Sequence, residues 1–297
     1  MGPLQTSSGS VGSRARFGVL VDRVPPLGYF MTSAIFHYLG PSFAVLLFAK
    51  IEVLGVAWLR IAAAAVVFGL SRRAWRFWSQ APQAQLLTVL ALGLALAAMN
   101  ASFYLAIARL PLGAVGAIEF LGPILLAAIG MRSLRNLAAL AFAAAGVAVL
   151  TNIRLAGEPL GYVFAFANAA LFLLYILLGH RIAASGGVAG IERLAAAMGV
   201  ALLAITPFGL GAAWPAFSDP LLLLAGAGVG IASSVVPYVC DQLAMARLSR
   251  AHFALLLSVL PAMASLIGLI LLRQVPSPAE LGGIALVVAG VALHREA

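Results

Sequence analysis

The 297-residue chain is short of charge and nearly free of cysteine. Only 9% of its residues are charged and 63% are hydrophobic, and the mean hydropathy is +1.08. So little polar surface cannot coat a water-soluble globule. The single cysteine, Cys240, excludes an intrachain disulfide and a cysteine-based metal site. These absences predict a polytopic membrane protein.

Motifs of catalysis and nucleotide binding are also missing. The chain has no GxxxxGK[ST] loop, no HExxH, and no Ser-His-Asp or paired-carboxylate set at useful spacing. We therefore expect neither an enzyme nor an ATP-driven pump, and no metal or cofactor. The glycine-rich GAGVG at 226–230 lies inside an apolar run without a preceding strand, so it predicts close helix packing and not a phosphate loop.

What the chain has in abundance is continuous apolar sequence. Ten runs are each long enough to cross a bilayer as a helix, which takes about twenty residues. They cover residues 27–49, 53–70, 85–108, 112–131, 136–153, 160–180, 191–212, 220–243, 251–272 and 279–294. The sequence thus predicts an all-α membrane protein with ten transmembrane helices.

The distribution of basic residues predicts the orientation of these helices. With the N-terminus inside, the inner side holds Arg14, Arg16, Arg23, Arg72, Arg73, Arg76, Arg132, Arg135, Arg181, Arg193, Arg247, Arg250 and Arg295. The outer side holds Lys50, Arg109, Arg154 and Arg273. This positive-inside bias predicts that both termini lie in the cytoplasm. It also accounts for the net charge of +9 without nucleic acid, since no basic patch has interleaved aromatics.

Two segments of the chain are loosely repeated. AIARLPLGAVGAIEFLGP at 106–123 returns 138 positions later as AMARLSRAHFALLLSVLP at 244–261, and AGVAV at 145–149 returns as AGVAL at 289–293. We expect a disordered cytoplasmic tail at 1–24, then one repeat at 25–155 and another at 156–297. Five helices per repeat is an odd number, so the two repeats are inverted, an architecture typical of secondary transporters.

Two ionisable residues lie inside apolar runs. Glu119 and Arg60 each stand about seven residues from the outer end of their helix, or about 10 Å deep at 1.5 Å per residue. A buried charge is costly in the membrane unless it is paired, hydrogen bonded or facing water. In the functional interpretation Glu119 binds a substrate ammonium or a proton, and Arg60 binds a carboxylate. A structural ion pair, or an Arg60 that reaches outward, is the alternative.

Other polar residues are distributed over several spans. Asn100, Asn168 and Tyr175 could contact substrate or hydrogen bond between helices. His37 stands before Gly40 and Pro41, which we expect to break the first helix. For His37 itself we favour a packing role.

Near the inner end of the eighth span, Asp241 is expected to meet water, either solvated or paired with Arg247 as a gate. Tyr238 follows Pro237, where we expect a kink. Gly122 with Pro123 in the first repeat, and Pro261 at the matched position of the second, are helix breakers at membrane depth that point to a transport path.

At these residues the chain resembles a known family. MNASFYLAIARLPLGAVGAIEFLGP at 99–123 is similar to the signature stretch of the threonine and homoserine exporter family, in the EamA-like branch of the drug/metabolite transporter superfamily. WLRIA at 58–62, VPYVCDQLAMARL at 236–248 and LPA at 260–262 continue the likeness. The positions that fall on the family pattern are Arg60, Asn100, Tyr104, Glu119, Gly122, Pro123, Pro237, Tyr238 and, as Asp in place of Glu, Asp241.

The resemblance implies proton-driven export of small amino acids such as threonine or homoserine. The expected partners are this substrate, a proton, the lipid bilayer and, where small residues face outward, a second copy in a homodimer. The chain departs from the pattern at two places: relatives often carry Glu where it has Leu260, and a Gly-Glu pair where it has Arg273 and Gln274, and this bears on the substrate. A drug exporter, with a cavity lined by Phe103, Phe120 and Phe172, and an uncoupled facilitator are the alternatives.

Overall fold

A computed structural model describes residues 24–71, 77–79, 81–122, 133–152, 158–184, 186–248, 253, 256–257 and 260–293. Within these ranges the elements are helical: α2 (Pro26–Leu47), α3 (Val53–Ser71), α5 (Gln83–Ile107), α6 (Leu112–Glu119), α8 (Leu134–Asn152), α9 (Pro159–Ala183), α10 (Gly187–Phe217), α11 (Pro220–Gly230), the π-helical turn η1 (Ile231–Val235), α12 (Val236–Met245), α14 (Leu260–Leu272) and α15 (Pro278–Leu293). The tail at 1–23 and Pro123 lie outside the described residues.

The helices follow the predicted apolar runs. Six of them are long and apolar enough to cross a membrane, and three shorter apolar helices lie within α8, α14 and α15. The fourth run, predicted at 112–131, is described up to residue 122 as α6 and two further helical residues. The prediction of an all-helical, multi-pass membrane protein is therefore confirmed.

Three local predictions about where helices end or break differ from the structure. The predicted runs 160–180, 191–212 and 220–243 left 181–190 and 213–219 as connections, but α10 also takes in residues 187–190 and 213–217 and contains Pro207 and Pro215. The chain turns only at Ser218 and Asp219, where the Asp219 carboxylate caps α11 by accepting from Leu221 N and Leu222 N. Pro41 likewise does not break the first helix, because α2 continues through it to Leu47.

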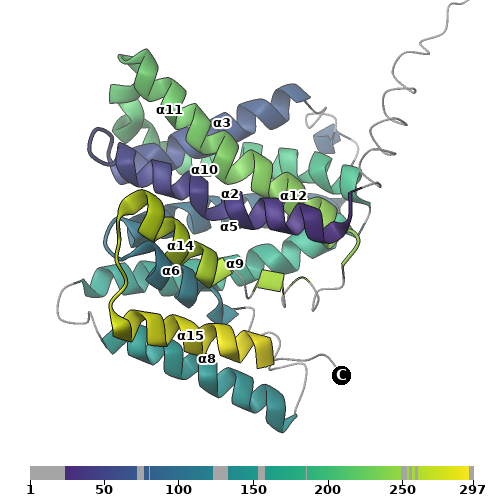
Figure 1. The fold of residues 1–297 in the computed structure, drawn as a ribbon. Coiled ribbons are helices and arrows are strands. Elements are labelled where there is room, and N and C mark those ends of the chain that lie inside the picture. Colours follow the sequence, from purple (N-terminus) through teal and green to yellow (C-terminus); the bar gives the residue numbers. More distant parts are fainter. Residues whose placement is uncertain are drawn as a thin grey trace, which may run out of the picture.

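Helices from the two halves of the sequence pack in pairs: α2 with α12, α5 with α9, α3 with α10, α6 with α14, and α8 with α15. In Figure 1, α8 and α15 lie side by side at one edge of the bundle, below α6 and α14. Each pair joins one span of residues 26–152 to one of residues 159–293. The interior of the bundle is thus an interface between the two halves.

Glycine lets several of these helices approach one another closely. A Cβ on Gly230 would overlap the Arg60 carbonyl and Ala63 of α3, and one on Gly226 would press on Leu59. The packing interpretation of GAGVG at 226–230 is confirmed at these two glycines.

The eighth span departs from the single helix predicted at 220–243. It is divided by the π-helical turn η1, against which α2 packs. A Cβ on Gly40 would overlap Ser233 in this turn. Short π-helical insertions change which backbone carbonyls are bonded within the helix. The turn therefore offers acceptors to a neighbouring side chain, and Arg60 uses them.

Candidate functional site

Glu119 ends α6 and is buried, with 2% of its surface exposed. Its carboxylate accepts hydrogen bonds from Tyr38 Oη at 3.1 Å and from Asn168 Nδ2 at 2.9 Å. His37 Nε2 lies 3.6 Å from the same oxygen that Tyr38 contacts. Three helices, α2, α6 and α9, thus meet at one carboxylate. Such partners offset part of the cost of burying its charge.

Arg60 is buried too, but its partners lie elsewhere. Its Nε donates to Ser234 Oγ at 2.8 Å, and its Nη2 donates to the Ser233 carbonyl at 2.7 Å, both in the π-helical turn. The guanidinium also stands over the Tyr104 ring, 5.3 Å from the centroid. In the described part of the chain no hydrogen bond or ion pair joins Arg60 to Glu119. The alternative of an Arg60 that reaches out of the membrane is excluded by its burial at 4% exposure.

Arg60 and Glu119 nevertheless line the same small cavity. Its other walls are His37, Met99, Asn100, Phe103 and Asn168. The free space is about 10 Å³, which is room for about one water molecule. Asn100 Oδ1 and Asn168 Oδ1 are buried and find no hydrogen-bond partner among the described residues. The residues around the cavity therefore include a cation, a carboxylate and two amide oxygens without a hydrogen-bond partner among the described residues.

Asn100 and Tyr238 form a polar contact beside this cavity. Asn100 Nδ2 donates to Tyr238 Oη at 3.2 Å and to the Leu96 carbonyl at 2.7 Å. The Tyr238 ring lies 5.4 Å from that of Tyr175. Asn100 on α5 and Tyr238 on α12 are both buried. Polar contacts therefore continue from the cavity, through Asn100, to Tyr238 on α12.

Asp241 differs from the sequence prediction. It is only 5% exposed, and its carboxylate accepts from Ser33 Oγ at 2.5 Å and from Tyr175 Oη at 2.9 Å. The expected gate pair is also absent among the described residues, since Arg247 donates to the carbonyls of Val24 and Leu243. Counting residues from the helix end placed Asp241 in water, but α2 and α9 cover it. The prediction of a solvated or Arg247-paired Asp241 is wrong.

The remaining candidates have structural surroundings that sequence could not show. A Cβ on Gly122 would overlap the Ala169 carbonyl and Leu173, so Gly122 permits close contact with α9. Pro237 lies in the first turn of α12, directly after the π-helical turn, and Pro261 lies buried in the first turn of α14. Pro237 thus lies inside a continuous helical segment from Pro220 to Met245, at the point where its π-helical turn ends.

Three residues of α2 belong to the site although sequence reasoning missed them or assigned them to packing. Ser33 and Tyr38 were not considered, and His37 was expected only to pack. A usable signal existed, because Ser33 and His37 are four residues apart and therefore share a helix face. Polar residues at that spacing in an apolar span indicate that this face of the helix meets polar groups.

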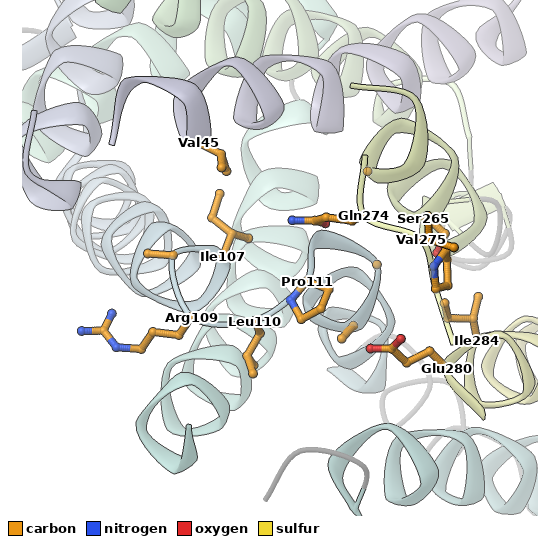
Figure 2. A pocket seen from close by; sticks show the side chains of 15 residues that line it. Val45, Ile107, Arg109, Leu110, Pro111, Ser265, Gln274, Val275, Glu280 and Ile284 are labelled. Atoms are coloured by element: carbon orange, nitrogen blue, oxygen red, sulfur yellow. The ribbon is translucent and has the colours of Figure 1, made fainter. Parts of the chain in front are cut away.

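A second, larger cavity lies at the opposite end of α6 from Glu119. It measures about 390 Å³ and is bounded by the loop between α5 and α6, by α14 and by the start of α15. Figure 2 shows the Glu280 carboxylate turned toward Pro111, while the Arg109 guanidinium points away. Arg109 instead stands over Phe164, 5.4 Å from its centroid. Gln274 Oε1 accepts from Leu112 N at 3.1 Å and so ties this rim to the start of α6.

Comparison with known proteins gives a consistent set of relatives. No protein-family model matches the chain. The threonine/homoserine exporter RhtA of Escherichia coli (strain K12) is 30% identical over 256 residues, 84% of either chain. The exporter of the same name from Salmonella typhimurium (strain LT2) is 30% identical over 241 residues, 79% of either chain. A solved crystal structure shares the fold with a TM-score of 0.56 at 19% identity, over 89% of this chain and 94% of its own.

Proposed function

The chain belongs to the threonine/homoserine exporter family of the EamA-like drug/metabolite transporter superfamily, and we propose that it exports small amino acids of the threonine and homoserine type by proton antiport. Its relatives are transporters, so the expectation that it is not an enzyme is confirmed. The membrane would be the bacterial inner membrane, with both termini in the cytoplasm.

The observation that carries this proposal is the shared cavity of Arg60 and Glu119. A free amino acid is a zwitterion, and it needs a cation for its carboxylate and an anion for its ammonium. Arg60 forms planar, paired hydrogen bonds that suit a carboxylate, and Glu119 suits the ammonium or a proton. The open oxygens of Asn100 and Asn168 are acceptors for the same ammonium or for a side-chain hydroxyl.

The lining of the cavity favours amino acids over larger apolar drugs. Of the three aromatic residues that would line a drug site, only Phe103 is among the cavity walls. Phe120 and Phe172 pack on each other at 6.2 Å between centroids. Pockets for apolar ligands are lined mainly by apolar and aromatic side chains, whereas five of the seven walls here are polar or charged.

Two inverted five-helix repeats, at 25–155 and 156–297, would supply the two alternating states. Supporting this, exchanging the two halves maps the observed helix pairs onto themselves, with α2–α12 replacing α5–α9. Proline-Leu-Gly-Tyr also begins both α2 and α9, at 26–29 and 159–162.

The most detailed support for the repeat comes from contacts between α8 and α15. Gly146 lies against the Gly283 carbonyl, and Gly290 lies against the Ala139 carbonyl. Gly146 and Gly290 are 144 positions apart, as are Ala139 and Gly283, which is the spacing of AGVAV and AGVAL. The two contacts therefore exchange when the repeats exchange, which is what a two-fold axis between the helices would produce.

Transport would require this small cavity to widen and to open toward each side of the membrane in turn. At about 10 Å³ it does not hold an amino acid in the present state. The cavity of about 390 Å³ at the Arg109 end of α6 would be the outer vestibule. Helices α6 and α14, which pair with each other, would move to connect the two spaces.

The direct test is Glu119→Gln, a change that removes the charge and nearly keeps the shape. In inside-out membrane vesicles, uptake of labelled threonine driven by a pH gradient should fall at least about a hundredfold, the scale of a lost proton-transfer group. The exposed carboxylate Glu158 provides the matched control, since Glu158→Gln should transport normally.

Two results would overturn the proposal. One is wild-type uptake by the Glu119→Gln protein at normal membrane levels. The other is wild-type uptake that does not respond to the pH gradient, which would indicate a facilitator. A panel of amino acids and apolar cations in the same vesicles distinguishes the amino acid exporter from a drug exporter.

A further inference from the structure

His37 lies between two buried carboxylates that belong to different halves of the chain. We propose that His37 passes the coupling proton between Glu119 and Asp241, an inference that rests on the proposed proton antiport and adds a route through the protein to it. The proposed route passes through three residues in turn: Glu119 on α6, His37 on α2 and Asp241 on α12.

Two neighbouring positions on α2 connect the two carboxylates. Ser33 donates to Asp241, and four residues later His37 Nε2 stands 3.6 Å from Glu119. Side chains at this spacing lie one above the other on a helix, about 6 Å apart. One face of α2 therefore contacts both carboxylates.

Asp241, His37 and Glu119 lie in this order along the length of the bundle. At one end, Arg247 donates to the Val24 carbonyl at 3.0 Å, so α2 begins where α12 ends. Ser33 and Asp241 lie nearest to this end, which is the predicted cytoplasmic one. Glu119 is seven residues into α6 from the opposite end, about 10 Å deep. His37, eleven residues into α2, or about 16 Å, falls between them.

The groups around His37 suit a transfer in either direction. Glu119 lies 3.6 Å from it on α6, Arg60 shares its cavity from α3, and Asp241 on α12 is bound by Ser33, one turn earlier on α2. Tyr38 and Tyr175 each donate to one of the two carboxylates and so hold it in place. The 3.6 Å gap to Glu119 is longer than a hydrogen bond. One water in the cavity, or a small movement of α2, would close it.

During export the proton moves inward while the amino acid moves outward. A protonated Glu119 gives its proton to neutral His37, which leaves a carboxylate and an imidazolium. The imidazolium then gives a proton to the Asp241 carboxylate, which releases it to the cytoplasm. Histidine suits the middle position because its charge changes within the physiological pH range. Ionised Glu119 is then free to bind the next substrate ammonium.

The experiment separates coupled transport from substrate exchange in proteoliposomes. Exchange of labelled for unlabelled threonine at equal pH on both sides needs the binding site but no net proton movement. Uptake driven by a pH gradient needs both. For His37→Gln we expect the gradient-driven rate to fall about a hundredfold, while exchange remains measurable. Asp241→Asn should likewise lose gradient-driven uptake and keep exchange. The test therefore remains valid if one of the two variants is unstable.

His180 supplies the matched control, because it is another buried histidine, on α9 against Phe253. His180→Gln should leave both rates unchanged. The inference is overturned if His37→Gln keeps gradient-driven uptake, or if it loses exchange and coupling in equal proportion, as a merely structural residue would. If wild-type uptake ignores the gradient, the proposed antiport itself fails, so the two failures are distinguishable.

Discussion

Asn100 on α5 donates a hydrogen bond to Tyr238 on α12, and the two residues would occupy equivalent positions in the two proposed repeats. They are 138 positions apart, the same spacing that relates 106–123 to 244–261. Residues related by a two-fold axis can touch only close to that axis. The proposed two-fold axis would therefore pass close to this contact, and Asn100 itself lines the cavity of Arg60 and Glu119.

This contact predicts coupled effects on stability. Tyr238→Phe removes the acceptor of Asn100 and should cost about 1 kcal/mol, a typical net value for a hydrogen bond. Asn100→Ala and Tyr238→Phe together should cost less than the sum of their separate effects, by about 0.5 kcal/mol or more. Denaturation of the purified protein in detergent measures these values.

The control for that cycle is Tyr175→Phe, whose hydroxyl contacts Asp241 and not Asn100. Its combination with Asn100→Ala should be additive. Additive behaviour of Asn100 and Tyr238 as well would show that their contact contributes nothing to the folded state.

Arg60 should determine recognition of the substrate carboxylate. Its Nε and Nη2 are held by the π-helical turn, a two-point arrangement that the single ammonium of lysine cannot reproduce. We expect Arg60→Lys to reduce the preference for threonine over its amino alcohol by about tenfold to a hundredfold, the range for a hydrogen bond to a charged group. Competition for labelled threonine uptake measures this preference.

A cation outside the cavity provides the comparison. Arg193 on α10 donates to the Ile182 carbonyl and to Gln85, so Arg193→Lys should keep the wild-type preference. An Arg60→Lys protein that still rejects the amino alcohol would place the carboxylate elsewhere.

Two glycines of α11 allow a matched test of helix packing. A Cβ at Gly230 would overlap the Arg60 carbonyl and Ala63, while one at Gly228 would meet open space. Gly230→Ala should therefore destabilise the protein by about 1–3 kcal/mol. Gly228→Ala should be neutral or stabilise it by up to about 1 kcal/mol. Equal melting temperatures for the two variants would contradict the observed approach of α11 to α3.

Much of the fold followed from the chain itself. Apolar runs predicted the spans because a helix needs about twenty such residues to cross a bilayer. The ends were less certain: α10 includes residues expected to be loops, since proline and alanine at 213–217 do not by themselves stop a helix. The π-helical turn was not foreseeable, because it depends on how α2 and α3 pack against it.

The sequence by itself determined which residues must be accommodated. Glu119 and Arg60 stand in apolar runs, and burial of a charge is costly enough that each needs a polar partner. It did not determine the partners. In the tertiary structure His37 and Asn168 lie beside Glu119. Arg60 donates to the π-helical turn, and Asp241 accepts from Ser33 and Tyr175. The physical reason is that depth follows from position along one helix, whereas lateral contact depends on which helices pack together and on their rotation.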